Sequence, residues 1–266
     1  MRLTKHHGLG NDFLVGSVDV LPDDAPSLAR GLCHRNRGVG ADGLILALPG
    51  NSDASTDAAM VLFNADGSRA EMSGNGIRCL AQALVQAGAS LDGALRIGTD
   101  AGVRTVSVTA TDDPAVVQAR VDMGPVSTGP ELGDGDVLRY LRHHGFADQF
   151  ATATVGNPHL VIGVQDVHQV DAARSGSELS RLAGGINVEF ISGMPDGINL
   201  RVWERGVGVT EACGTGACAA AQAAHRWGLA GPVVRVCMPG GDVVVELGDP
   251  VFLLGPAEFI ATVDCD

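Results

Sequence analysis

The sequence carries one pattern twice, as EMSGNGIRC (residues 71–79) and EACGTGACA (residues 211–219). Both copies read Glu-x-(Ser/Cys)-Gly-x-Gly and continue into small and apolar residues typical of a helix. The first copy has a hydroxyl at Ser73 where the second has a thiol at Cys213. Each copy therefore predicts the N-terminus of a helix, where unpaired N–H groups and a partial positive charge favour an anion.

The segments around these copies follow the same order in both halves of the chain. Each half places one mostly apolar helix, expected at 76–89 and 216–228, among short β-branched runs typical of strands. A hairpin is expected after each helix, and further helices at 26–36, capped by Ser27, and at 177–184. An internal duplication explains this order. We place the domain boundary near residues 110–120, with a cleft between two halves that pack directly on each other.

Composition excludes several classes of function. The chain has 266 residues, of which 45% are hydrophobic, so it can form a substantial core. Its net charge of −13 and the lack of a basic block argue against nucleic acid as a partner. No apolar run is long enough to cross a bilayer, and six scattered cysteines without an export signal indicate reduced thiols in the cytoplasm.

Cofactor chemistry is also disfavoured. Lys5 is the only lysine and lies in the expected first strand, which is a poor position for a pyridoxal phosphate Schiff base. There is no Cys-x-x-Cys pair, and Cys213 and Cys218 are five residues apart, which does not suit zinc. We therefore expect neither a cofactor nor a metal ion.

Two helix N-termini facing one ligand suit a particular reaction. Both ends can hold one carboxylate while their side chains lie on opposite faces of the α-carbon. One group then removes the α-proton and the other returns a proton on the opposite face, provided that electrostatics stabilise the carbanion-like intermediate. The helix field is expected to lower the pKa of the Cys213 thiol from about 8.5 towards neutrality, which would make it a base.

Several further blocks extend the pattern along the chain. They are HGLGNDF (7–13), FNADGS (63–68), SGNGIRC (73–79), GNPH (156–159), NVEF (187–190), ERGVGVTEACGTGA (204–217) and MPGG (238–241). In this order, and across nearly the whole chain, they resemble diaminopimelate epimerase. The combination is highly specific, although each block alone is weak.

The resemblance implies a fold and an activity. The expected fold is α/β, with two pseudo-symmetric domains that are each a curled, mostly antiparallel sheet around a central helix. The expected domains span residues 1–115 and 116–255, and the C-terminal strand 256–266 returns to the first. The implied activity is that of a cofactor-independent isomerase, which interconverts LL- and meso-diaminopimelate in lysine and peptidoglycan precursor synthesis. Family members often form dimers, so a homodimer is implied as well.

The resemblance also assigns roles to individual residues. Cys213 matches one catalytic thiol, and His159 and Glu204 match residues that tune the acid/base groups. The remaining matches are contacts of a substrate with carboxylates at both ends. Gly74, Asn75, Gly214 and Thr215 match the carboxylate cradle, Arg205 the grip on the distal carboxylate, and Asn11, Asn64, Asn157 and Asn187 polar contacts.

The chain departs from the family pattern at Ser73, where a second catalytic cysteine is expected. A hydroxyl is rarely ionised near neutral pH without a strong base beside it. In one interpretation the chain is a two-base epimerase impaired by this residue. In a second, an unequal Ser/Cys pair works with help from His159. In a third, the scaffold serves a dehydratase of hydroxy amino acids, as in relatives of proline racemase.

Two other functions remain open at this point. The chain could bind an amino acid without catalysis, or Ser73 and His159 could form the nucleophile–base pair of a hydrolase. The absence of a G-x-S-x-G elbow argues against the hydrolase. Asparagines and a Glu–Arg pair at the distal end suit a second charged terminus, which favours the epimerase over the dehydratase.

Overall fold

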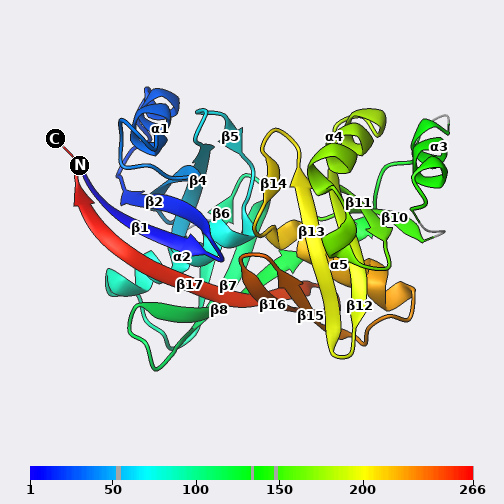
Figure 1. Ribbon diagram of the computed structural model, residues 1–266. Coiled ribbons are helices and arrows are strands. Elements are labelled where there is room, and N and C mark those ends of the chain that lie inside the picture. The colour runs from blue at the N-terminus through cyan, green and yellow to red at the C-terminus, as the bar shows by residue number, and fades with distance from the viewer. Residues whose placement is uncertain (52–54, 133–134, 147–148, 266) are drawn as a thin grey trace. The chain divides into compact units, whose positions relative to one another are not determined.

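The computed structural model describes residues 1–51, 55–132, 135–146 and 149–265. The chain divides into two compact units, one formed by Met1–Asp122 with Leu254–Asp266 and the other by Met123–Leu253 (Figure 1). Within the described residues, no helix is both long and apolar enough to cross a membrane.

The first unit surrounds one buried helix with strands. Its elements are β1 (Arg2–Gly8), β2 (Asn11–Ser17), α1 (Ala25–Cys33), β3 (Gly43–Pro49), β4 (Ala58–Asn64), β5 (Arg69–Ala70), α2 (Gly74–Gln86), β6 (Ala94–Thr99), β7 (Gly102–Ala110) and β8 (Val116–Gly124). The last strand, β17 (Val251–Asp264), runs antiparallel to β1, with Arg2 opposite Asp264. Helix α2 contacts β1, β2, β3, β4 and β7, so its mostly apolar surface is covered by strands.

The second unit repeats this order. Its elements are β9 (Ser127–Thr128), α3 (Asp136–His143), β10 (Phe150–Thr154), β11 (Pro158–Gly163), the 3₁₀ turn η1 (Val167–Gln169), α4 (Ala172–Leu182), β12 (Asn187–Met194), β13 (Gly197–Glu204), β14 (Gly208–Thr210), α5 (Gly214–Arg226), β15 (Val233–Met238) and β16 (Gly241–Glu246). Helix α5 occupies the place of α2, and the hairpin β15–β16 follows it as β6–β7 follows α2.

Strand pairing is also repeated. β2 pairs with β3 in parallel and β3 with β4 antiparallel, while β11 pairs with β12 in parallel and β12 with β13 antiparallel. The predicted fold class is therefore confirmed: each unit is a mostly antiparallel set of strands around a central helix.

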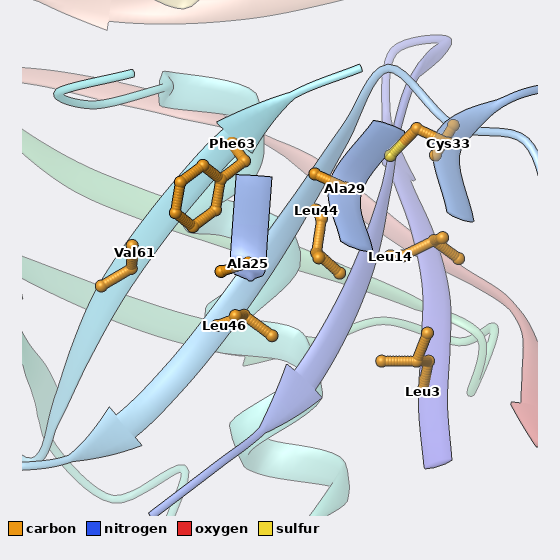
Figure 2. Packing of buried hydrophobic residues seen from close by; sticks show 10 residues of the cluster. Leu3, Leu14, Ala25, Ala29, Cys33, Leu44, Leu46, Val61 and Phe63 are labelled. Carbon is orange, nitrogen blue, oxygen red and sulfur yellow. The ribbon is translucent and has the colours of Figure 1, made fainter. Parts of the chain in front are cut away.

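Strand alternation in the first unit separates two packing faces. Successive side chains of a strand point to opposite faces, and Leu44 and Leu46 of β3 join a cluster with Ala25 and Ala29 of α1 (Figure 2). Ile45, between them, faces α2 instead, since a Cβ on Gly76 would lie 3.2 Å from its Cδ1. The same strand therefore supports a packing helix on one side and the helix of the repeated motif on the other.

All four predicted helices have bounds that differ from the sequence prediction, and the residues at the helix N-terminus explain two of the differences. Helix α1 begins at Ala25 after Asp24, so Ser27 is not its N-cap, and Pro26 occupies the first turn, where its missing N–H costs nothing. Helix α4 begins at Ala172, five residues before the predicted start, because Asp171 caps it by accepting a hydrogen bond from Arg174 N at 3.0 Å.

A completely buried arginine ties α2 to the strand that closes the unit. Arg78 has 0% exposure, and its Nε donates to Pro256 O at 3.0 Å while Nη1 donates to Gly74 O at 3.0 Å. Its Nη2 donates to Asn75 Oδ1 at 2.9 Å. One side chain thus links the first turn of the helix to β17, which is remote in sequence.

We expect Arg78→Met to lower the free energy of unfolding by about 2–5 kcal/mol, because it leaves several buried acceptors without donors. Urea unfolding followed by circular dichroism measures the change. Arg69→Met is the matched control: Arg69 pairs with Asp100 at the surface, so its loss should cost less than about 1 kcal/mol. Equal losses in both variants would contradict the structural role of Arg78.

Candidate active site

Ser73 and Cys213 occupy the same local position in their units. Each is the N-cap of its helix, with φ and ψ of −136° and 125° at Ser73 and −134° and 114° at Cys213. Ser73 Oγ accepts a hydrogen bond from Gly76 N at 3.0 Å, and Cys213 Sγ accepts one from Gly216 N at 3.4 Å. The duplicated motif therefore places the hydroxyl and the thiol identically with respect to a helix N-terminus.

In the first unit, the residues around Ser73 are joined by a network of side-chain hydrogen bonds. Asn75 Nδ2 donates to Asn11 Oδ1 at 3.1 Å, and Asn11 Nδ2 donates to Asp42 Oδ2 at 2.8 Å. Gly74 and Asn75 are buried in the first turn of α2. The predicted contacts Asn11, Gly74 and Asn75 are therefore held in one group beside Ser73.

Asn64 has a local structural role. It ends β4, and its Nδ2 donates to Ser68 Oγ at 3.0 Å while its backbone N donates to Ser68 O at 2.8 Å. The Asn64 amide thus stabilises the turn that follows the strand, which is a common use of asparagine.

In the second unit, His159 is completely buried between two polar partners. Its Nδ1 lies 2.7 Å from Glu189 Oε1 and its Nε2 lies 2.9 Å from Asn157 Oδ1. His159 and Glu189 both have 0% exposure. The structure thus brings the predicted residues Asn157 and His159 together and adds Glu189, which the sequence analysis did not select.

The remaining predicted residues of this unit surround the end of β13 and the start of α5. Asn187 Oδ1 accepts from the backbone N of Arg205 at 2.9 Å, and the exposed Arg205 side chain donates from Nη1 to Gly185 O at 3.1 Å. Glu204 accepts a hydrogen bond from Thr210 Oγ1. Thr215 Oγ1 lies 3.5 Å from Cys213 Sγ, and Gly214 is buried in the first turn of α5.

The predicted lowering of the Cys213 pKa is wrong. Burial raises the pKa of the Cys213 thiol well above its ordinary value, and the nearby carboxylates of Glu204 and Glu189 raise it further. The hydrogen bonds from Thr215 and Gly216 act in the opposite direction and are weaker. Cys213 is therefore a thiol near neutral pH, so it can donate a proton.

Glu204 responds to the same environment. Burial raises the pKa of its carboxyl, while hydrogen bonding to Thr210 and Cys213 opposes the rise. Cys79 does not replace the missing thiol: it is completely buried within α2, and burial raises its pKa to about 12.

Sequence reasoning missed two hydrogen-bond partners of the predicted site residues, for different reasons. Glu189 lies inside the apolar run NVEFIS of β12, and an acidic residue within a buried strand was a signal that could have been read. Asp42 orients Asn11 from a segment 31 residues away, and nothing in its local sequence indicates that contact. Within the described part of the chain, no group of His, Cys, Asp or Glu side chains is arranged to hold a metal ion.

The comparisons with known proteins cover almost the whole chain. The family model for diaminopimelate epimerase matches residues 3–129 and 151–260. The chain belongs to the diaminopimelate epimerase family. It is 41% identical to the diaminopimelate epimerase of Desulfitobacterium hafniense, covering 98% of this chain and 96% of that protein, and 42% identical to that of Pelotomaculum thermopropionicum, with 97% and 96% coverage.

Solved structures show that this fold is also used outside the diaminopimelate epimerase family. A phenazine biosynthesis protein of Bacillus anthracis superposes with a TM-score of 0.74 at 14% identity, over 99% of this chain and 98% of that one. A hydroxyproline epimerase of Agrobacterium vitis superposes with a TM-score of 0.72 at 18% identity, over 99% and 91%. At such low identity the likeness establishes the fold alone.

The two equivalent glycines give a matched test of the half-sites. A Cβ on Gly216 would lie 2.8 Å from Glu189 Oε1, which His159 holds in place, and 3.2 Å from Cys213 Sγ. A Cβ on Gly76 would instead meet carbon atoms at 3.2 Å or more, including the flexible ends of Ile45 and Met60.

We therefore expect Gly216→Ala to destabilise the protein by about 1–3 kcal/mol, through overpacking against a fixed carboxylate. Gly76→Ala should stay within about 1 kcal/mol of the parent, because the gain in helix propensity offsets a mild overlap. Thermal and urea unfolding of both variants measure the difference. A larger loss for Gly76→Ala would show that the Glu189 carboxylate does not limit this space.

Proposed function

We propose that the protein is a cofactor-independent epimerase that interconverts LL- and meso-diaminopimelate by moving the α-proton from one face of the carbon to the other. Family membership over nearly the full chain supports the substrate. The observation that carries the reaction is the matched capping geometry of Ser73 and Cys213. The proposal requires both side chains to reach opposite faces of one α-carbon when substrate is bound.

In this mechanism the helix N-termini bind the substrate carboxylate. Backbone N–H groups at Gly74 and Asn75, and at Gly214 and Thr215, have the position and partial charge to hold an anion. The same field stabilises negative charge that develops when the α-proton leaves. The exposed Arg205 would bind the distal carboxylate. Polar contacts would come from Asn11, Asn64, Asn157 and Asn187.

Ser73 is the residue that fits this mechanism least well. Cys213 rests as a thiol because of burial and two carboxylates, so the opposite group has to act as the base. A serine hydroxyl is a poor base precursor without a strong base beside it. Both ring nitrogens of His159 already have partners in their own unit, Glu189 and Asn157. This arrangement favours the impaired epimerase over an unequal pair in which His159 assists the serine.

The proposal also covers the setting of the reaction. The small-molecule partner is an amino acid with carboxylates at both ends, and the reaction belongs to lysine and peptidoglycan precursor synthesis. We place the enzyme in the cytoplasm, which suits six free cysteines, and we expect a homodimer. Neither nucleic acid nor a membrane is a proposed partner.

The decisive experiment follows two processes in deuterated water with LL- and meso-diaminopimelate. Exchange of the α-proton is read by mass spectrometry, and inversion by chiral chromatography. We expect inversion to be slow in the parent and to rise about 10²- to 10⁴-fold in Ser73→Cys, because a competent acid/base group is restored.

Ser73→Ala separates the alternatives. If the hydroxyl contributes nothing, the residual inversion stays at the parent level, whereas an unequal Ser/Cys pair predicts a clear loss. Release of water from hydroxyproline would instead support the dehydratase. No gain of inversion in a folded Ser73→Cys variant would refute the impaired-epimerase proposal.

Arg205 tests the distal contact. We expect Arg205→Ala to weaken diaminopimelate binding by about 2–5 kcal/mol, because the bound carboxylate would cover the guanidinium and lose its partner. Isothermal titration calorimetry measures the dissociation constant. Arg226→Ala, which removes another exposed arginine at the C-terminal end of α5, should leave the constant unchanged. A dissociation constant that Arg205→Ala does not change would exclude this role.

A further inference from the structure

Glu189 is a completely buried carboxylate that is only partly satisfied. Its Oε1 accepts from His159 at 2.7 Å, whereas Oε2 has no hydrogen-bond partner among the described residues and is fully buried. Burying a carboxylate with an unbonded oxygen is costly. A group of this kind calls for an explanation beyond packing.

The strand pattern of β12 places this carboxylate against α5. Val188 and Phe190, the neighbours of Glu189, belong to the apolar cluster that includes Leu179 of α4. Because side chains alternate along a strand, Glu189 points to the other face, where α5 packs on β12. A Cβ on Gly216 would be 2.8 Å from Glu189 Oε1 and 3.2 Å from Cys213 Sγ. The carboxylate therefore lies beside the thiol, next to the first turn of the helix.

The equivalent place in the first unit is apolar. Val161 is opposite Glu189 in the parallel pair β11–β12, and Val15 is opposite Ile45 in the corresponding pair β2–β3. Ile45 lies next to Gly76 just as Glu189 lies next to Gly216. The same register places Phe13 where the second unit has His159. The first unit thus has the same arrangement of strands and helix without the carboxylate and the imidazole, so the fold itself does not require these groups.

We propose that Glu189 is a positioning residue that, with His159, keeps Cys213 in its protonated form between turnovers, so that this side of the site rests as the proton donor. A negative charge next to a thiol disfavours the thiolate. Glu204 at the end of β13 adds charge of the same sign, while the helix N-terminus and Thr215 oppose it. His159 on β11 anchors the Glu189 carboxylate through Nδ1.

This role sets the protonation state in which Cys213 starts each turnover. The assignment rests on the proposed function, in which the Ser73 side takes the α-proton from one face while the Cys213 S–H bond breaks and a new C–H bond forms on the other face. The thiolate left behind stands beside two acidic side chains, and their repulsion favours its return to the thiol by uptake of a proton from water. In the first unit, the equivalent residues Ile45 and Phe13 carry no charge, so they exert no such repulsion on the Ser73 side chain.

The test measures the ionisation of Cys213 without any substrate. The ultraviolet absorbance of the thiolate is recorded against pH for the protein and for its Cys213→Ala variant, and the difference isolates this one thiol. We expect Glu189→Gln to lower the midpoint by about one pH unit or more, which corresponds to about tenfold more thiolate at a fixed pH below the midpoint. Glu189→Asp, which keeps the charge, should keep the high midpoint.

Two controls exclude other causes. Glu178→Gln removes an exposed carboxylate from α4 of the same unit, so it makes the same change in net charge and should not move the midpoint. Glu189→Ile reproduces the residue found at the equivalent place in the first unit. It should lower the midpoint in the same direction as Glu189→Gln.

The outcomes are distinct from those of the epimerase assay. An unchanged midpoint in folded Glu189→Gln or Glu189→Ile would overturn the proposal. Failure of both variants to fold, as judged by circular dichroism, would make Glu189 a structural residue and overturn it as well. Since the titration contains no diaminopimelate, it can succeed or fail whether or not the protein proves to be an epimerase.

Discussion

The hydrogen bond from the backbone of each duplicated glycine to the N-cap side chain is the interaction on which this site depends. It is made by Gly76 N to Ser73 and by Gly216 N to Cys213. The bond satisfies a helix N–H that otherwise lacks a partner. It also fixes the hydroxyl or thiol beside the other N–H groups of the first turn. The same atoms therefore cap the helix and serve as the proposed acid/base group. Replacing sulfur by oxygen preserves the helix cap but changes the acidity of that group.

The behaviour of Cys213 shows how local and tertiary effects compete. A helix N-terminus alone lowers the pKa of a thiol, and the bond from Gly216 acts in that direction. Burial and two carboxylates from neighbouring strands act in the opposite direction and prevail. Besides burial, the pKa of Cys213 is raised by Glu204 and Glu189, which are 9 and 24 residues away in sequence.

The two units carry different residues at a position where the fold does not require one residue type. Position 45 and position 189 lie on equivalent strands beneath equivalent helices, and one is Ile while the other is Glu. Arg78, with 0% exposure, places a cation close to the first half-site, whereas carboxylates surround the second. The duplicated scaffold therefore places different charged groups around its two N-cap residues.

The sequence by itself determined the duplication, the two helix starts and the family, because the glycine pattern and the apolar periodicity that follows it are local features. It also placed Ser73 and Cys213 at helix N-termini, where the structure shows them to be the N-cap residues. Only the tertiary structure decided which partners surround them. The pairing of His159 with Glu189 and of Asn11 with Asp42 joins segments 30 and 31 residues apart. The raised pKa of Cys213 depends on burial, which no single segment specifies, because the strands that exclude water from the thiol come from distant parts of the chain.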